Sequence, residues 1–240
     1  MGSGVPPIQV GDWSVADPVA VVLHYCRRYA ATLHRYDWLA GSTGTLSGDL
    51  VGATRRVNSR ISRREQRWLL DRAATAPWDS VDPAALLRDA DPFARGGLYD
   101  AAEQLYQHFA GDRPSGVNHA KISKCLYLMR PGLVPILDSR LVARYRRAAR
   151  TAARTLVVGC PDRPSVRRAY WAAVRNDLLR ATDSVAMVRD RMRGSSHRAV
   201  VEAANRLSDV RVLDILAWST GGPGPAAVGD HRHARRKDCR

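Results

Sequence analysis

Two lysines and one aspartate near the middle of the chain are the residues best suited to chemistry. Lys121 and Lys124 lie three residues apart, so on a helix they occupy neighbouring parts of one face. Either amine could contact a phosphate or, if burial lowered its pKa, act as a nucleophile. Asp138 follows the apolar stretch 133–137 and precedes a helical pattern, which is the position of a helix N-cap. A carboxylate there can cap the helix, take part in chemistry, or do both.

A short turn precedes the lysines. Gly116-Val117-Asn118 lies between two helical patterns, and asparagine is the residue other than glycine that best tolerates positive φ. Such a turn would point backbone N–H groups and the N-terminus of the next helix outward, which suits a bound phosphate. A simple turn between two helices needs the same residues, so this interpretation stays open beside the first.

Arginines follow Asp138 in large excess over acids. Between residues 140 and 168 there are nine arginines and one acid, Asp162. The apolar positions of the first helix in this stretch share one face, so its arginines form a ridge. A ridge of arginines beside a tight turn could follow a phosphate backbone. The predicted nucleic-acid-binding residues are Gly116, Asn118, Arg140, Arg144 and Arg147.

The charge of the whole chain favours the same class of partner. The 240 residues include 38 Lys and Arg against 23 Asp and Glu, a formal net charge of +15. A surplus of this size attracts polyanions, so we predict a nucleic acid, DNA first, as the partner. Solubility alone is the alternative explanation. The 45% of hydrophobic residues is enough for a full core, which argues against a disordered protein.

The cysteines and the termini suggest no metal site and no membrane. The four cysteines form no C-x-x-C pair, so we predict no zinc or iron-sulfur site and no cofactor. His231 and His233 could bind a metal, but a solvated tail is the favoured interpretation. No stretch approaches 18 apolar residues, and no signal pattern is present at the N-terminus. We therefore expect a cytoplasmic protein with reduced thiols, nucleoid-associated if it binds DNA.

Helical periodicity dominates the chain and predicts an all-α fold with one multi-helix domain. Apolar spacing predicts helices over 18–39, within 46–58, over 62–74 with Ser62 as N-cap, and over 97–109. Further helices are expected from Lys121, after Asp138, over 164–180 and over 195–218. Strand-like alternation is nearly absent. The expected organisation is an N-terminal arm (1–16), a helical domain (17–220) and a flexible basic tail (221–240).

One resemblance covers most of the chain. The segments 122–126 (ISKCL) and 130–138 (RPGLVPILD) are similar to the hallmark A-S-K-L-L-x-x-K-R-P-x-L-x-P-V-Y-D of a bacterial family of uncharacterised domains, domain of unknown function number 6308. The spacing from Lys124 to Asp138 is the same. Segments 49–53 (DLVGA) and 211–218 (RVLDILAW) resemble an early and a late element of that family. The resemblance brings no known activity.

The segment 116–145 more distantly resembles the active segment of helix-hairpin-helix DNA glycosylases, which implies a helix-hairpin-helix-like centre. In those enzymes a Gly-Val-Gly hairpin, a lysine, an apolar stretch and a Pro-Val-Asp follow in this order. The resemblance implies that Asp138 stabilises positive charge on the deoxyribose or activates water, and that Lys121 attacks the sugar after base flipping, with Lys124 as rival nucleophile. Asn118 replaces the second glycine, and Asp138 follows Lys121 by 17 residues, slightly closer than in those enzymes.

Three functions are therefore compatible with the sequence. The first is a DNA-binding protein that excises a damaged or modified base, with or without lyase activity. The second is a non-enzymatic DNA- or RNA-binding module that uses only the turn and the arginines. The third is a helical protein whose basicity is incidental. Candidate stacking residues for the first function are Tyr127, Tyr145, Trp171 and Trp218, although each is better explained as core.

Overall fold

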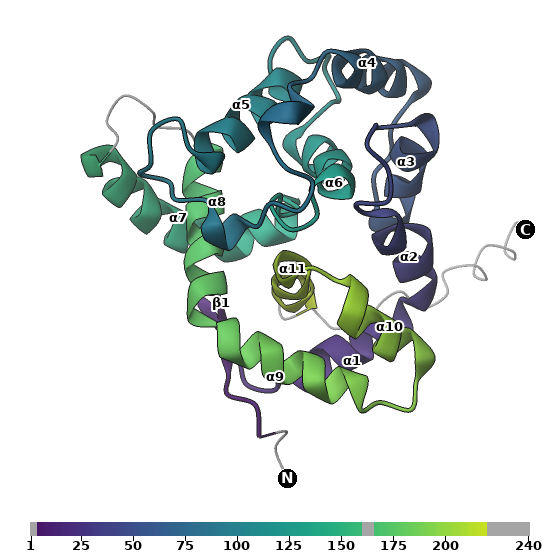
Figure 1. Cartoon of the computed structure of the whole chain (residues 1–240), viewed down its shortest axis with the longest axis vertical. Coiled ribbons are helices and arrows are strands. Elements are labelled where there is room, and N and C mark those ends of the chain that lie inside the picture. The colour runs from purple at the N-terminus through teal and green to yellow at the C-terminus, as the bar shows by residue number, and fades with distance from the viewer. Residues whose placement is uncertain (1–3, 160–165, 220–240) are drawn as a thin grey trace, which may run out of the picture.

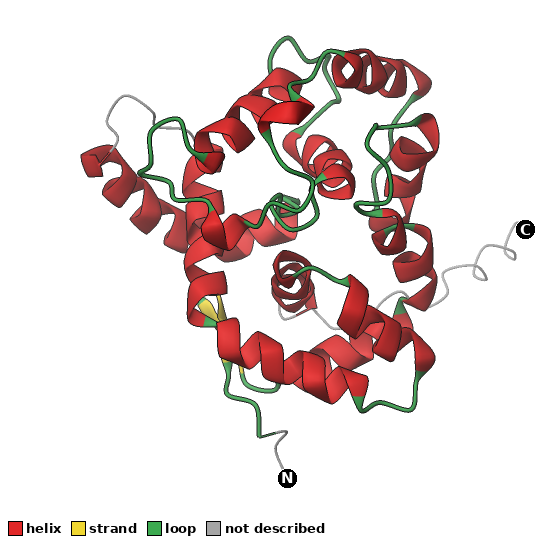
Figure 2. Cartoon of the chain, in the orientation of Figure 1, coloured by secondary structure: helices red, strands yellow, loops and turns green. Residues whose placement is uncertain are grey.

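The computed structural model describes residues 4–159 and 166–219, and these residues form an all-α domain, as predicted (Figures 1 and 2). The α-helices are α1 (Pro18–Arg28), α2 (Ala30–Arg35), α3 (Gly48–Ala53), α4 (Arg63–Ala74), α5 (Leu98–Ala110), α6 (His119–Met129), α7 (Ser139–Gly159), α8 (Val166–Arg180), α9 (Thr182–Arg193), α10 (Arg198–Arg206) and α11 (Asp209–Ser219). Short 3-10 helices are η1 (Asp37–Leu39), η2 (Thr54–Val57), η3 (Trp78–Ser80) and η4 (Leu87–Asp89). The predicted tail at 221–240, with His231 and His233, lies outside the described residues.

Two central helices carry the middle of the core. In α6 the eight consecutive residues 122–129 are buried, and in α11 the eight residues 210–217 are buried. A helix that is buried on every side must be surrounded by other elements. In Figure 1, α11 lies in the middle of the view, with α6 above it and α1, α9 and α10 below. Polar side chains on α6 and α11 are therefore held inside the protein.

The segment predicted as an N-terminal arm contains a small antiparallel sheet. Strands β1 (Ile8–Val10) and β2 (Trp13–Val15) pair across a turn at Gly11. Gly11 has φ +62 and donates its N–H to Asp177 Oδ2 at 2.6 Å. A Cβ at this position would lie 2.5 Å from the carbonyl oxygen of Arg144, so only glycine allows the turn to approach α7 this closely. Ile8 and Val10 are fully buried, which fixes the hairpin to the helical core.

Several helix ends were predictable from capping chemistry. Asp17 accepts a hydrogen bond from Ala20 N ahead of Pro18, and Ser62 forms a full capping box with Glu65. The predicted helix 18–39 is instead divided into α1, α2 and η1, because Tyr29 leaves the helical conformation at φ −114.

The predicted C-terminal helix over 195–218 is also wrong as a single element. It is divided at Leu207, whose backbone is extended, and Ser208 Oγ accepts from Arg211 N to begin α11. Helix α9 was not predicted, because its buried positions Val185, Val188 and Met192 form only a narrow apolar stripe. No helix among the described residues combines the length and apolarity needed to cross a bilayer.

Candidate nucleic-acid interface

The turn before α6 has the positive φ at its glycine and not at its asparagine. Gly116 has φ +100, whereas Asn118, which could also have tolerated a positive φ, has φ −105. Asn118 instead acts as the N-cap of α6, and its Oδ1 accepts from Lys121 N at 3.0 Å. The turn is closed by a hydrogen bond from Val117 N to the carbonyl of Pro114 at 3.1 Å. The side-chain oxygen of Asn118 is therefore occupied by capping the N-terminus of α6.

Lys121 joins the turn to α4. Its Nζ lies 2.7 Å from Glu65 Oε1, and both side chains are largely covered. Burial alone would raise the pKa of Glu65, but hydrogen bonds from Lys121 and Ser62 hold it below its ordinary value. A Cβ on Gly116 would overlap Glu65 Oε1, so the glycine allows this approach. The amine of Lys121 is thus committed to a carboxylate in this structure.

Lys124 is the more buried of the two lysines. Its side chain is 5% exposed, and Nζ donates to the carbonyl of Val57 at 2.5 Å. Burial lowers the pKa of this amine, and the nearby charge of Asp138 partly offsets the effect. Lys124 therefore holds its amine inside the protein against the backbone of η2, whereas Lys121 is only partly buried.

Asp138 caps α7, which is one of the two roles that the sequence left open. Its Oδ1 accepts from the N–H groups of Arg140 and Leu141, each at 3.0 Å. The preceding backbone is held from two sides. Ser123 Oγ accepts from Leu137 N at 3.1 Å, and Asp214 Oδ2 accepts from Ile136 N at 3.1 Å. The position of Asp138 is therefore fixed by side chains of the two central helices.

The arginine ridge predicted on α7 is only partly exposed. Arg144 is 8% exposed and lies over the ring of Trp13 at 4.2 Å, so its placement on an open ridge is wrong. Arg168 is buried and ion-paired with Asp100. Arg140 is exposed but lies over Trp218 at 4.5 Å. The residues that remain as a free basic stripe on α7, hereafter the α7 stripe, are Arg146, Arg147, Arg150 and Arg154; they form no hydrogen bond or ion pair within 4–159 and 166–219.

A second basic surface was missed by the sequence reasoning. Six exposed arginines of η2, α4 and the loop between them also have no hydrogen-bonding or ion-pair partner among the described residues. This surface, hereafter the α4 surface, consists of Arg55, Arg56, Arg60, Arg63, Arg64 and Arg67. The signal was present as the run TRRVNSRISRREQR at 54–67. Figure 1 places α4 at the upper right and the end of α7 at the far left, so the Gly116 turn lies with the α4 surface and not with the α7 stripe.

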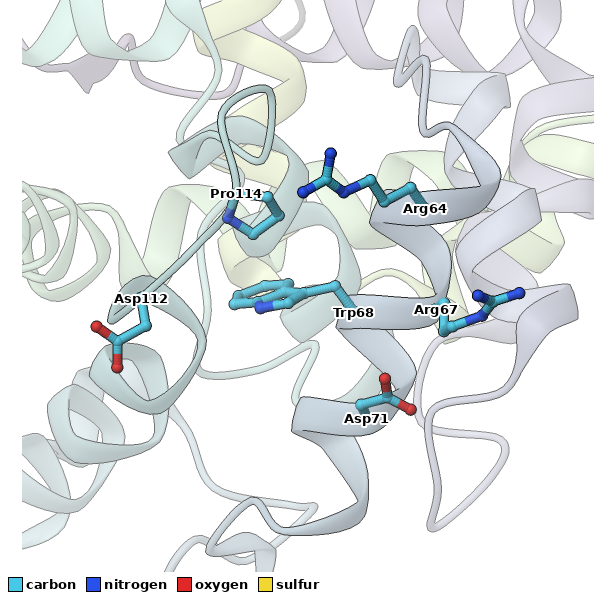
Figure 3. Close-up of a pocket in the computed structure, with 6 residues that line it drawn as sticks. All are labelled: Arg64, Arg67, Trp68, Asp71, Asp112 and Pro114. Atoms are coloured by element: carbon cyan, nitrogen blue, oxygen red, sulfur yellow. The ribbon is translucent and has the colours of Figure 1, made fainter.

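A pocket of about 400 Å³ opens between α4 and the segment before Gly116 (Figure 3). Its lining residues are Arg64, Arg67, Trp68, Asp71, Asp112 and Pro114. Sequence reasoning missed Trp68. The aromatic residues Tyr127, Tyr145 and Trp171 that it named instead are at most 1% exposed and belong to the core, whereas Trp218 is partly exposed beneath Arg140.

Comparison with known proteins identifies the family. The profile of the family of unknown function DUF6308 matches residues 25–221, which is most of the chain. The chain belongs to this family. No curated protein and no solved structure matches it. The resemblance to helix-hairpin-helix glycosylases therefore stays a prediction.

The segments in which the sequence resembles the family hallmark lie on or beside α6 and α11 in this structure. The 49–53 segment coincides with α3, which packs against α6, and the 122–126 segment lies within α6. The late segment begins with Arg211, whose guanidinium lies 5.7 Å from the ring of Tyr127 on α6. It also supplies Asp214, which holds the backbone ahead of Asp138. These segments thus build the frame that carries Lys124 and Asp138.

Proposed function

We propose that the protein binds DNA through exposed arginines of the α4 surface and the α7 stripe. The observation that carries the proposal is that exposed guanidinium groups gather on these two surfaces, six on the first and four on the second, and that none of them is neutralised by a carboxylate among the described residues. In a protein of formal charge +15, such groups remain available to phosphates and release counterions on binding. The Gly116 turn and the N-terminus of α6 adjoin the α4 surface and are the proposed third contact.

The length of the α7 stripe suits a duplex backbone. Residues 146 and 154, which bound the stripe, are separated by about 12 Å at 1.5 Å per residue. This is the length of about three to four base pairs at 3.4 Å per step. Contacts of this kind position a protein on DNA without reading its sequence. The proposal therefore predicts binding that depends strongly on salt and weakly on sequence.

The test is the salt dependence of DNA affinity for two charge-neutralised variants and one matched control. We expect Arg60→Gln/Arg63→Gln/Arg67→Gln and Arg147→Gln/Arg150→Gln/Arg154→Gln each to reduce the slope of log affinity against log salt by about three. Affinity near physiological salt should fall at least tenfold. The control Arg27→Gln/Arg28→Gln/Arg35→Gln removes the same charge from exposed positions on α1 and α2. Absent or salt-independent binding, or an equal loss in the control, would contradict the proposal.

A second candidate function is base excision, favoured by the desolvated amine of Lys124 beside the charge of Asp138. A lowered pKa leaves more of the amine unprotonated and nucleophilic. In this reaction Lys124 Nζ bonds to C1′ of the deoxyribose while the base leaves with the electrons of the glycosidic bond. Opening of the sugar ring then gives a Schiff base. Asp138 stabilises the positive charge that develops on the sugar. Lys121 contacts a carboxylate whereas Lys124 contacts a neutral backbone carbonyl, and the lowered pKa of Lys124 makes it the preferred nucleophile of the two.

Borohydride trapping tests this second function. The protein is incubated with duplexes that carry uracil, 8-oxoguanine, an alkylated purine or an abasic site, and covalent adducts are counted. We expect an adduct that persists in Lys121→Gln and is lost in Lys124→Gln. Circular dichroism of each variant checks that the loss is not caused by unfolding, and Asp138→Asn should slow trapping in a folded protein. No adduct and no base release on any of these duplexes would exclude excision and leave DNA binding as the function.

A further inference from the structure

The pocket beside the Gly116 turn combines an aromatic ring with separated charges. Trp68 projects from α4 into the pocket, and Pro114 faces it from the segment that leads into the turn (Figure 3). The guanidinium of Arg64 reaches over the indole toward Pro114, whereas the carboxylates of Asp71 and Asp112 lie on the other side of the ring. Such a site offers a stacking surface, a cation for a phosphate, and acceptors for N–H groups.

The ring of Trp68 is held in place before any ligand arrives. It is half-buried and packs against the hydrophobic core. The guanidinium of Arg72 lies 6.0 Å from the ring centroid and is itself fixed by a hydrogen bond from Nε to the carbonyl of His108 at 2.8 Å. Because the ring is already ordered, little conformational entropy is lost when a ligand stacks on Trp68.

The surroundings of the pocket determine what can enter it. Arg64 and Arg67 belong both to the pocket lining and to the α4 surface, so a phosphate backbone on that surface passes the mouth of the pocket. The carboxylates of Asp71 and Asp112 belong to exposed residues on the other side of the ring from Arg64, where they would repel a phosphate but accept hydrogen bonds from base amino and imino groups. A nucleotide therefore fits in one orientation, with its phosphate toward Arg64 and its base toward Trp68.

We infer that this pocket binds an unpaired base of single-stranded DNA by stacking on Trp68. The inference rests on the proposed function, because the α4 surface must first bring DNA to the pocket. The inference specifies single-stranded DNA and not duplex DNA as the ligand of this pocket. A base inside an intact duplex is already stacked on its neighbours and does not present a free face. A single-stranded segment presents such a face at every nucleotide.

The test compares Trp68→Leu and Trp68→Phe on a labelled adenine dodecanucleotide and on a blunt duplex. Leucine keeps apolar bulk but has no aromatic face, whereas phenylalanine keeps the face. We expect Trp68→Leu to lose about 5- to 100-fold in single-strand affinity, and Trp68→Phe to lose much less. Duplex affinity should change less than twofold in both. The oligonucleotide should quench tryptophan fluorescence in the wild type, and this quenching should be largely absent in Trp68→Phe although the variant still binds.

A matched control and the contrary outcomes separate this inference from the proposed function. Phe93→Ala removes another exposed aromatic ring, 44% accessible and outside the pocket lining, and should leave single-strand affinity unchanged. If the wild type binds DNA with a steep salt dependence but Trp68→Leu binds single strands equally well, the pocket inference is overturned and DNA binding stands. If the wild type binds neither single strands nor duplex, both fail. Melting temperatures of the two Trp68 variants within a few degrees of each other exclude a folding effect.

Discussion

Replacing Arg211 by methionine is expected to lower the free energy of unfolding by about 3–5 kcal/mol. Arg211 Nε donates to Asp37 Oδ1 at 2.7 Å, and Nη2 donates to Tyr25 Oη at 3.0 Å. Both members of the ion pair are buried. Burial alone would lower the pKa of Arg211, but the charge of Asp37 raises it above its ordinary value. Methionine would fill much of the space yet leave the Asp37 carboxylate with Tyr127 as its remaining partner, at 3.1 Å.

Equilibrium urea denaturation of three proteins checks this expectation. Arg198→Met breaks an ion pair with Glu202 at 2.8 Å in which the arginine is 90% exposed, so it should change stability far less. The double variant Asp37→Asn/Arg211→Met removes the orphaned charge and should regain part of the loss. Equal losses in Arg211→Met and Arg198→Met would show that the buried pair does not support the fold as argued.

Arg211, at the start of the segment 211–218, has a structural role that the sequence alone does not indicate. In the sequence, Arg211 is one of 38 basic residues, and nothing marks it as buried. Its partner Asp37 lies 174 residues earlier. The fold brings the two segments together, because α11 packs against α1 and Arg211 bonds both Tyr25 of α1 and Asp37 of η1. Pairing over such a distance leaves no periodic signal in the chain, so sequence reasoning could not find it.

Local features were more accessible to prediction than the exposure of charges. Ser62 and Asp17 were recognisable because capping depends on residues within three positions of the cap. The apolar face of α7 was also readable from its spacing, and Tyr145 and Ala152 are buried as expected for that face. The arginines of α7 were not separable in this way. Arg144 faces Trp13 of the N-terminal hairpin, and Arg147 faces solvent, although both are arginines on one helix.

The candidate site likewise has features that were predictable from local sequence and features that depend on long-range contacts. The order of the Gly116 turn, Lys121 and Asp138 was visible in the sequence, and the capping position of Asp138 followed from it. The commitment of Lys121 to Glu65 was not visible, because Glu65 lies 56 residues away on α4. The pocket at Trp68 depends on the same long-range contact between α4 and the turn. The residues able to do chemistry could therefore be identified from the sequence, whereas the residues that they contact could be identified only from the structure.

Asp214 should make the protein less stable as the pH rises from about 4 to 8. Burial raises the pKa of this carboxyl to about 8, against the opposing effects of Arg211 and the Ile136 N–H group. Its Oδ1 has no hydrogen-bond partner among the described residues, so the ionised form is poorly compensated. In the unfolded chain the group has a pKa near 3.9. Between these values the folded protein holds a proton that the unfolded chain has released. Stability should therefore fall by up to about 1.4 kcal/mol for each pH unit in this window.

Urea denaturation of Asp214→Asn and the wild type at half-unit steps from pH 5 to pH 9 isolates this contribution. Asparagine is neutral at every pH and keeps a carbonyl oxygen that can accept from Ile136 N, so the slope due to position 214 should disappear. Asp177, whose pKa is also raised by burial, remains in both proteins, so any slope it causes cancels in the difference. The difference should grow from pH 5 toward pH 8 and level off above it, where both states are ionised. Parallel profiles would mean that Asp214 is already ionised in the folded protein, and that Arg211 compensates its charge as well as that of Asp37.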